Sequence, residues 1–291
     1  MNMTTSQVHV VAAVRNRIAI TKKFIDKLQK QTFNNLHLLL IDDGSSDGTP
    51  RMVAESPINS TIIYGDGNLW WGGALHQAYL WFAANKVNQE DYVLIMNDDV
   101  IIEDDFIEKG IICLYQKEKA LLTCYGYGLH NRLLMDGPIV YRFASGKSYI
   151  TKEVEAANCA STRALFFRVR DFLDIGGFHP VLLPHYGSDY EFTIRAWKKG
   201  YEIISDSSMK YFYDEQTTGN MYYLDLLPGQ FMKKMFSRKS VYNPLYKLTF
   251  IMLACPVRYI PINLCFQITR YIKNIFSYIK VRIAGKKERK V

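Results

Sequence analysis

The first hundred residues alternate short apolar runs with segments of helical periodicity, and no other feature of the chain constrains the fold as strongly. The apolar runs are typical of buried strands and lie at Val8–Val14, Leu36–Ile41, Thr61–Tyr64 and Tyr92–Met96. The segments between them favour helices at Ala19–Gln31, Thr49–Glu55 and Gly73–Asn85. Strands and helices alternating at this spacing predict parallel βαβ units. We therefore expect an α/β fold with a mostly parallel central sheet flanked by helices.

Beyond residue 104 the pattern is mixed. We expect short strands near Leu121–Tyr125 and Ala164–Val169, and a helix over Phe192–Lys199 that ends at Gly200. Acidic residues almost vanish after Gly229, and we place a boundary there. The predicted organisation is a body of residues 1–229, with halves at about 7–103 and 104–229, and a tail of residues 230–291.

Polar residues follow three of the predicted strands, at the point where each strand ends. Asp42 to Ser45 follows the second strand, Gly67 and Asn68 follow the third, and Asn97 to Asp99 follows the fourth. Ligands of open α/β sheets bind beyond the carboxyl ends of the strands. These three segments are therefore expected to line one cleft.

The acidic residues of this cleft suit the recognition of a nucleoside diphosphate. Adjacent carboxylates such as Asp98 and Asp99 repel each other unless a cation or hydrogen-bond donors offset them. Mg²⁺ or Mn²⁺ needs only one or two protein carboxylates when phosphate oxygens complete its shell. The alternative is a solvated acidic turn. Similarly, Asp43 either caps a turn or accepts the imide N–H of a uracil or thymine ring.

Several motifs resemble those of a known family in their residues and order. They are AAVRNR before residue 18, IDDGSSDGT at 41–49, MNDDV at 96–100, DIGGF at 174–178, GSDYEF at 187–192, and then Arg195 and Gly200. Over about residues 7–215 the chain resembles the family 2 glycosyltransferases of the GT-A fold. The segment at 67–74 resembles a subgroup with rhamnosyl- and galactofuranosyltransferase-like members, found in bacterial surface-polysaccharide pathways.

The resemblance implies a role for each matching residue. A dTDP- or UDP-sugar donor would contact Ala13, Asn16, Asp43, Asn68, Gly73 and Asp98. Among these, Asp43 would hold the pyrimidine. Asp99 would bind the divalent cation, Mg²⁺ or Mn²⁺, that bridges the diphosphate. Asp189 would be the general base for the acceptor hydroxyl, which displaces the nucleoside diphosphate with inversion.

The chain departs from the family pattern at two places. Ser188 stands where relatives often have Glu before the catalytic Asp, and Glu191 follows three positions later. Many relatives also have a metal-binding His downstream, where this chain reads KYFYDE at 210–215. Asp214 offers an alternative oxygen ligand there, or metal binding rests on Asp99 and phosphate alone.

Four further residues are candidates for acceptor binding or support: Trp70, Trp71, His185 and Glu191. His185 lies four residues before Asp189, where it either assists that carboxylate or is structural. The two tryptophans either stack on a sugar or nucleobase or pack in the interior.

The tail differs from the body in charge. Residues 231–291 hold 14 Lys and Arg and one acid, whereas the rest of the chain holds 22 bases and 27 acids. Leu245–Ile268 is apolar but interrupted by prolines and charges, and Ile268–Ile283 has the pattern of an amphipathic helix. We expect this tail to bind an anionic membrane surface; the alternative is a helical subdomain packed on the body. No nucleic-acid-binding motif is present.

Five cysteines without CxxC spacing argue against a disulfide framework, and the N-terminus does not resemble a signal peptide. The resulting expectation is a cytoplasmic enzyme, peripheral on the inner membrane. It would extend a polyprenyl-diphosphate-linked glycan of a cell-surface polysaccharide. The alternatives are a sugar nucleotidyltransferase, whose usual glycine-rich phosphate loop AAVRNR does not match, and a non-catalytic membrane adaptor that binds nucleotide sugars.

Overall fold

A computed structural model describes residues 6–152, 156–216 and 228–288. Its centre is a seven-stranded sheet with the strand order β12-β6-β11-β4-β1-β2-β3. The strands are β1 (Val8–Val14), β2 (Leu36–Asp42), β3 (Ser60–Tyr64), β4 (Tyr92–Met96), β6 (Ala120–Thr123), β11 (Ala164–Arg168) and β12 (Glu202–Ile204). Strands β4, β1, β2 and β3 are mutually parallel, whereas β11 runs antiparallel to both of its neighbours. The expected α/β fold is confirmed.

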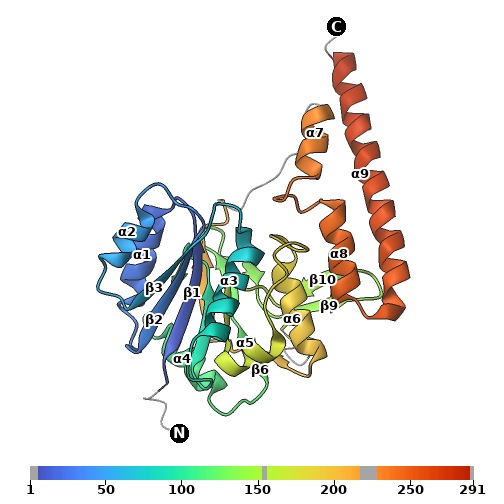
Figure 1. Cartoon of the computed structure of the whole chain (residues 1–291). Helices are drawn as coiled ribbons and strands as arrows, with labels where there is room; N and C mark the ends of the chain where they lie inside the picture. Colours follow the sequence, from blue (N-terminus) through green and yellow to red (C-terminus); the bar gives the residue numbers. More distant parts are fainter. Residues whose placement is uncertain (1–5, 153–155, 217–227, 289–291) are drawn as a thin grey trace.

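Helices cover both faces of this sheet (Figure 1). The first face carries α1 (Ile18–Leu28), α2 (Thr49–Ala54) and α4 (Phe106–Leu114), and the second carries α3 (Trp70–Ala84), α5 (Val169–Ile175) and α6 (Ser188–Lys198). Because successive strand residues point to opposite faces, Val10 packs in the first core and Val11 in the second. Strands buried on both sides explain the continuous apolar runs of the sequence.

A second, smaller sheet lies beside the carboxyl end of β4. It has the order β5-β13-β7-β8, with β5 (Val100–Ile102), β13 (Lys210–Tyr213), β7 (Tyr125–Gly128) and β8 (Leu134–Asp136). Strands β9 (Ile139–Arg142) and β10 (Lys147–Ile150) form a separate hairpin. In the small sheet Tyr213 pairs with Val100, which brings Asp214 near the acidic turn.

The first hundred residues fold as expected, with shifts of up to three residues at element ends. The later predictions need two corrections. The strand expected at Leu121–Tyr125 is two strands, β6 and β7, in different sheets. The helix expected at Phe192–Lys199 begins earlier, at Ser188. Its N-cap is Gly187, whose left-handed conformation (φ 86°) glycine adopts without strain. Asp189 therefore lies in the first turn of α6.

The C-terminal helices pack on the body through residues 250–264, and the last helix extends beyond it (Figure 1). They are α7 (Pro228–Met235), α8 (Pro244–Ala254), a short 3₁₀ helix (Val257–Tyr259) and α9 (Ile260–Glu288). Phe250 and Ile251 of α8 pack on Ile194 of α6. The boundary expected near Gly229 stays a prediction. Residues 217–227, which precede it, lie outside the described part of the chain. Within the described residues, no helix combines the length and apolarity that crossing a membrane requires.

Candidate active site

Asp43 holds the loop between β3 and α3. Its Oδ1 accepts hydrogen bonds from the backbone N–H groups of Gly67 (2.9 Å) and Leu69 (3.1 Å), and its Oδ2 accepts one from Trp70 (3.2 Å). The loop needs such support, because Gly67 and Trp70 both have positive φ angles of 87° and 58°. The structure thus gives Asp43 an architectural contact, and its contact with a pyrimidine stays a prediction.

Asn16 joins the ends of β1 and β2. Its backbone N–H donates to Oγ of Ser45 (2.8 Å), and its side-chain Oδ1 accepts from the N–H of Ser46 (2.7 Å). Ala13 pairs in register with Ile41 just before this junction. Asn16 is therefore held beside the polar segment that follows β2, at the carboxyl ends of both strands. Their contacts with a donor stay predictions.

The loop of Gly67 and Asn68 lies at the same edge. Asn68 is exposed there, and its N–H donates to Oδ1 of Asp66 (2.9 Å). At the start of α3, a Cβ on Gly72 would lie 2.4 Å from the carbonyl oxygen of Leu183, whereas one on Gly73 would be 3.4 Å from its nearest neighbour. Gly72, which the sequence reading did not select, is thus the glycine that packing requires.

Asp98 is buried against α1. Its Oδ2 accepts a hydrogen bond from Oγ1 of Thr21 (3.0 Å), and its Oδ1 lies 3.1 Å from Nε of Arg17. Burial raises the pKa of Asp98 to about 6, although the Arg17 guanidinium opposes that shift. Both oxygens of Asp98 are thus occupied by protein groups, and its contact with ribose or sugar stays a prediction.

Asp99 has one engaged oxygen and one free oxygen. Its Oδ2 accepts from Nη2 of Arg17 (3.0 Å), whereas its buried Oδ1 has no hydrogen-bond partner. With Asp98 and Asp214 it lines a cavity of about 740 Å³ beside α1. An orphaned carboxylate oxygen beside two further acids fits a hard divalent cation. Within the described part of the chain no cluster of three His, Cys, Asp or Glu forms a complete metal site, so phosphate would supply further ligands.

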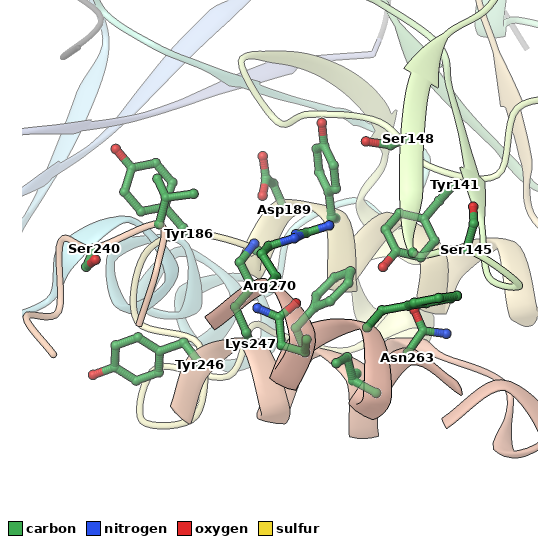
Figure 2. A pocket seen from close by; sticks show the side chains of 18 residues that line it. Tyr141, Ser145, Ser148, Tyr186, Asp189, Ser240, Tyr246, Lys247, Asn263 and Arg270 are labelled. Carbon is green, nitrogen blue, oxygen red and sulfur yellow. The ribbon is translucent and has the colours of Figure 1, made fainter. Parts of the chain in front are cut away.

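Asp189 lies at the wall of a different cavity, of about 450 Å³, between α6 and the C-terminal helices (Figure 2). Its side chain is half-buried. Burial raises the pKa of Asp189 to about 6; the negative charge of Asp136 adds to the shift, and Arg163 opposes it. A carboxylate with this pKa is a better proton acceptor than an ordinary aspartate and is still ionised at neutral pH.

Asp136 and Arg163 link the acidic turn of Asp98 and Asp99 to Asp189. We did not select either residue from the sequence. Oδ2 of Asp136 accepts hydrogen bonds from Ser161 Oγ and Tyr211 Oη, each over 2.6 Å. The guanidinium of Arg163 lies 4.0 Å from the ring centre of Tyr213, and the Arg163 carbonyl accepts from the N–H of Asn97 (3.1 Å). Arg163 thus places a positive charge beside the acidic turn, within electrostatic reach of Asp189.

Comparison with known proteins agrees with this arrangement. Residues 9–170, more than half of the chain, match the sequence model described as glycosyl transferase family 2. The chain belongs to this family. No curated protein matches it closely enough to add a finer assignment.

Two solved structures have a similar fold. One is the mannosyltransferase PcManGT from Pyrobaculum calidifontis in complex with GDP-Man and Mn²⁺, with a TM-score of 0.60 and 16% identity over 97% of this chain and 75% of that one. The other is TarS 1-349 from S. aureus in complex with UDP-GlcNAc, with a TM-score of 0.60 and 14% identity over 97% of this chain and 92% of that one. At these identities the likeness confirms the GT-A fold of the family 2 glycosyltransferase.

In this family 2 glycosyltransferase, Glu191 stabilises the segment that positions Asp189. Its buried carboxylate accepts hydrogen bonds from Nε and Nη2 of Arg195, over 2.9 and 3.0 Å. Arg195 also donates to the carbonyls of Ile175 (2.6 Å) and Gly177 (2.8 Å), which fixes the turn after α5. The motifs GGF, SDYE and R thus form one cluster that holds the start of α6 and, with it, Asp189.

The tryptophans and His185 contact other protein side chains in the structure. Trp71 donates from Nε1 to Oγ1 of Thr162 (2.9 Å), next to Arg163. The ring of Trp70 lies 6.0 Å from that of His185 and under the ammonium of Lys239. Burial, with Lys239 adding to it, lowers the pKa of His185 to about 4, so the imidazole is neutral at pH 7. Contacts of these residues with an acceptor stay predictions.

Proposed function

We propose that this glycosyltransferase moves a hexose, such as rhamnose, from a dTDP- or UDP-sugar to a hydroxyl of a polyprenyl-diphosphate-linked glycan. The pathway would be the synthesis of a bacterial surface polysaccharide such as O-antigen or capsule. The observation that carries the proposal is the carboxylate of Asp189, which has a raised pKa and lines a cavity of about 450 Å³.

The proposed reaction is a single displacement with inversion. Asp189 takes the proton of the acceptor hydroxyl while its oxygen attacks the anomeric carbon of the donor sugar. The new glycosidic bond forms as the bond from the anomeric carbon to the diphosphate breaks, and the nucleoside diphosphate leaves with the electron pair. Burial of Asp189 assists this step, because it makes the carboxylate a stronger base.

Stabilisation of the leaving diphosphate would come from two sources at the donor edge. Asp99, with its free Oδ1, would hold a divalent cation, which would neutralise the charge that develops on the diphosphate. Arg163 would add a fixed positive charge on the side of the edge nearer Asp189. The positive charge of Arg163 would explain how the proposed enzyme works without the metal-binding His that many relatives have.

We also propose that the enzyme is peripheral on the cytoplasmic face of the inner membrane and binds there through α9. The buried residues of α9 include Asn263 and Gln267, which face the body, and Asn263 donates to the carbonyl of Phe143 (2.6 Å). The predicted apolar side is exposed, at Ile268, Ile272, Ile275, Phe276 and Ile279. A helix that turns its polar side inward and its apolar side outward, among basic residues, suits an anionic lipid surface.

A panel of nucleotide sugars tests the function. Thermal unfolding is measured with dTDP- and UDP-sugars, GDP-mannose and ATP, with and without Mn²⁺. A ligand that binds only the folded state stabilises it by about 2.7 kcal/mol at a hundredfold excess over its dissociation constant. A pyrimidine diphosphate sugar is expected to raise Tm, and more so with Mn²⁺. A panel without any shift contradicts the proposal, and pyrophosphate release from a nucleoside triphosphate would favour a nucleotidyltransferase.

A further inference from the structure

The cavity beside Asp189 is built jointly by the body and the C-terminal helices. Asp189 and Tyr190 of α6 form one side together with the hairpin of β9 and β10, and α8 and α9 form the other (Figure 2). Most of the lining is neutral, with tyrosine, serine, asparagine and glutamine side chains and the rings of Phe250 and Phe266. Among the described residues, the charged side chains that line it are one acid, Asp189, and two bases, Lys247 and Arg270.

The two bases lie next to each other without a matching pair of acids. Figure 2 shows the side chains of Lys247 and Arg270 side by side in the middle of the cavity, facing the carboxylate of Asp189. Among the described residues, no carboxylate forms an ion pair with either base. Burial lowers the pKa of Lys247 and repulsion from Arg270 lowers it further, whereas the negative charge of Asp189 acts in the opposite direction. With Asp189 ionised, these three side chains together carry one excess positive charge.

We propose that Lys247 and Arg270 bind a phosphate or diphosphate group of the acceptor within this cavity. Lysine and arginine are the usual protein ligands of phosphate, and arginine binds its oxygens in a bidentate manner. An anion between the two bases removes their repulsion and offsets the cost of burying Lys247. The proposal rests on the proposed function in one respect: it identifies the bound group as part of the acceptor because Asp189 lines the same cavity.

This position would set the distance between the anionic group and the reacting hydroxyl. Both bases come from C-terminal helices, Lys247 from α8 and Arg270 from α9, so the tail contributes directly to the acceptor site. Phe266 of α9 lines the cavity and is also 42% exposed. A phosphate with an attached hydrocarbon chain would therefore find apolar contacts at the rim, whereas a water-soluble phosphate would use the bases alone.

Binding of inorganic pyrophosphate tests the site without knowledge of the acceptor. Isothermal titration is carried out on the full chain with EDTA present, which removes any metal that would bind pyrophosphate at Asp99. Lys247→Gln and Arg270→Gln are each expected to weaken binding by about tenfold, since each removes one charged hydrogen-bond partner of the phosphate. Lys273→Gln is the matched control, because Lys273 is an exposed base on α9 that does not line the cavity. Equal binding by all four proteins would overturn the proposal.

Two further titrations identify the source of the phosphate and separate this proposal from the donor chemistry. Farnesyl diphosphate binding more tightly than pyrophosphate, with the same loss in both variants, supports a lipid-linked group; equal affinity supports a water-soluble phosphate. The nucleotide-sugar Tm shift is expected to persist in Lys247→Gln. If pyrophosphate binds through the two bases while no nucleotide sugar shifts Tm, the anion site stands and the proposed function falls.

Discussion

Arg17 donates from Nη2 to Oδ2 of Asp99 over 3.0 Å, and its Nε lies 3.1 Å from the neighbouring Asp98. One guanidinium thus compensates both carboxylates of the acidic turn. From the sequence we expected a divalent cation or hydrogen-bond donors to offset this pair of carboxylates. A cation that binds at Asp99 has to compete with Arg17 or share the carboxylate with it.

Replacing Arg17 with Gln is therefore expected to tighten Mn²⁺ binding. Loss of one positive charge within 4 Å of two carboxylates raises their attraction for a dication, by several-fold or about 1 kcal/mol at a partly exposed site. The measurement is a Mn²⁺ titration followed by electron paramagnetic resonance in the presence of UDP. Arg51→Gln, on the exposed surface of α2, is the control. Weaker Mn²⁺ binding in Arg17→Gln would show that Arg17 helps to form the metal site instead.

The pH dependence of transfer follows from Asp189. Its pKa is raised to about 6, so the carboxylate is available as a base only above that pH. Below pH 6, kcat/KM is expected to fall about tenfold per pH unit. The sign for stability is opposite: because the folded state holds this proton more tightly, the stabilisation is present below pH 4 and is lost as pH rises through 6.

Asp98 has a similar pKa of about 6, so a control is needed. Asp98→Asn is expected to keep the acidic limb of the rate profile, since Asp189 is unchanged. An acidic limb that lies near pH 4 in the wild-type enzyme, or one that disappears in Asp98→Asn, would contradict the assignment to Asp189.

Two Glu–Arg pairs at helical i, i+4 spacing differ in burial. Glu191 and Arg195 form a buried pair, whereas Arg51 and Glu55 form an exposed one. Glu191→Ala is expected to lower the free energy of unfolding by about 3 kcal/mol, because Arg195 loses its partner in a mostly buried site. Glu55→Ala should change it by less than about 0.5 kcal/mol. Urea denaturation measures both, and equal effects would show that the Glu191 cluster does not hold α6.

Membrane attachment through α9 is tested with vesicles that contain anionic phosphatidylglycerol. Ile272→Ser with Phe276→Ser is expected to reduce cosedimentation by about tenfold, since two side chains lose part of their transfer free energy to the membrane. Leu133→Ser, at an exposed apolar residue of the body, is the control. Unchanged binding of the double variant, or binding that is equally strong to neutral vesicles, would contradict this mode of attachment.

The fold of residues 7–103 was predictable because its signals are local. Buried parallel strands such as Val8–Val14 are continuous apolar runs, and their order along the chain places Asp43, Asn68 and Asp99 at one edge. The periodicity of α1 and α3 was equally visible. What these signals do not include is hydrogen bonding between segments, and therefore the loop-holding contacts of Asp43 and the pairing of Arg17 were not foreseen.

The acceptor half depends on contacts between distant segments. Arg163 directly precedes β11. It reaches the acidic turn after β4 only because β11 is antiparallel to β4. Nothing in the apolar run of β11 reveals its direction. Likewise the sequence shows Lys247 and Arg270 only as two bases of a basic tail. The packing of α8 on α6 and of the start of α9 on α8 and the body brings them to Asp189.

The most direct test of the account is Asp189→Asn, with donor binding and sugar transfer measured on the same protein. Asparagine keeps the shape of the side chain but cannot accept the proton. We predict that the variant retains the Tm shift with the nucleotide sugar, while its transfer to a polyprenyl-diphosphate-linked acceptor falls by at least about a hundredfold. Transfer at the wild-type rate by Asp189→Asn would contradict the central claim that this carboxylate is the catalytic base.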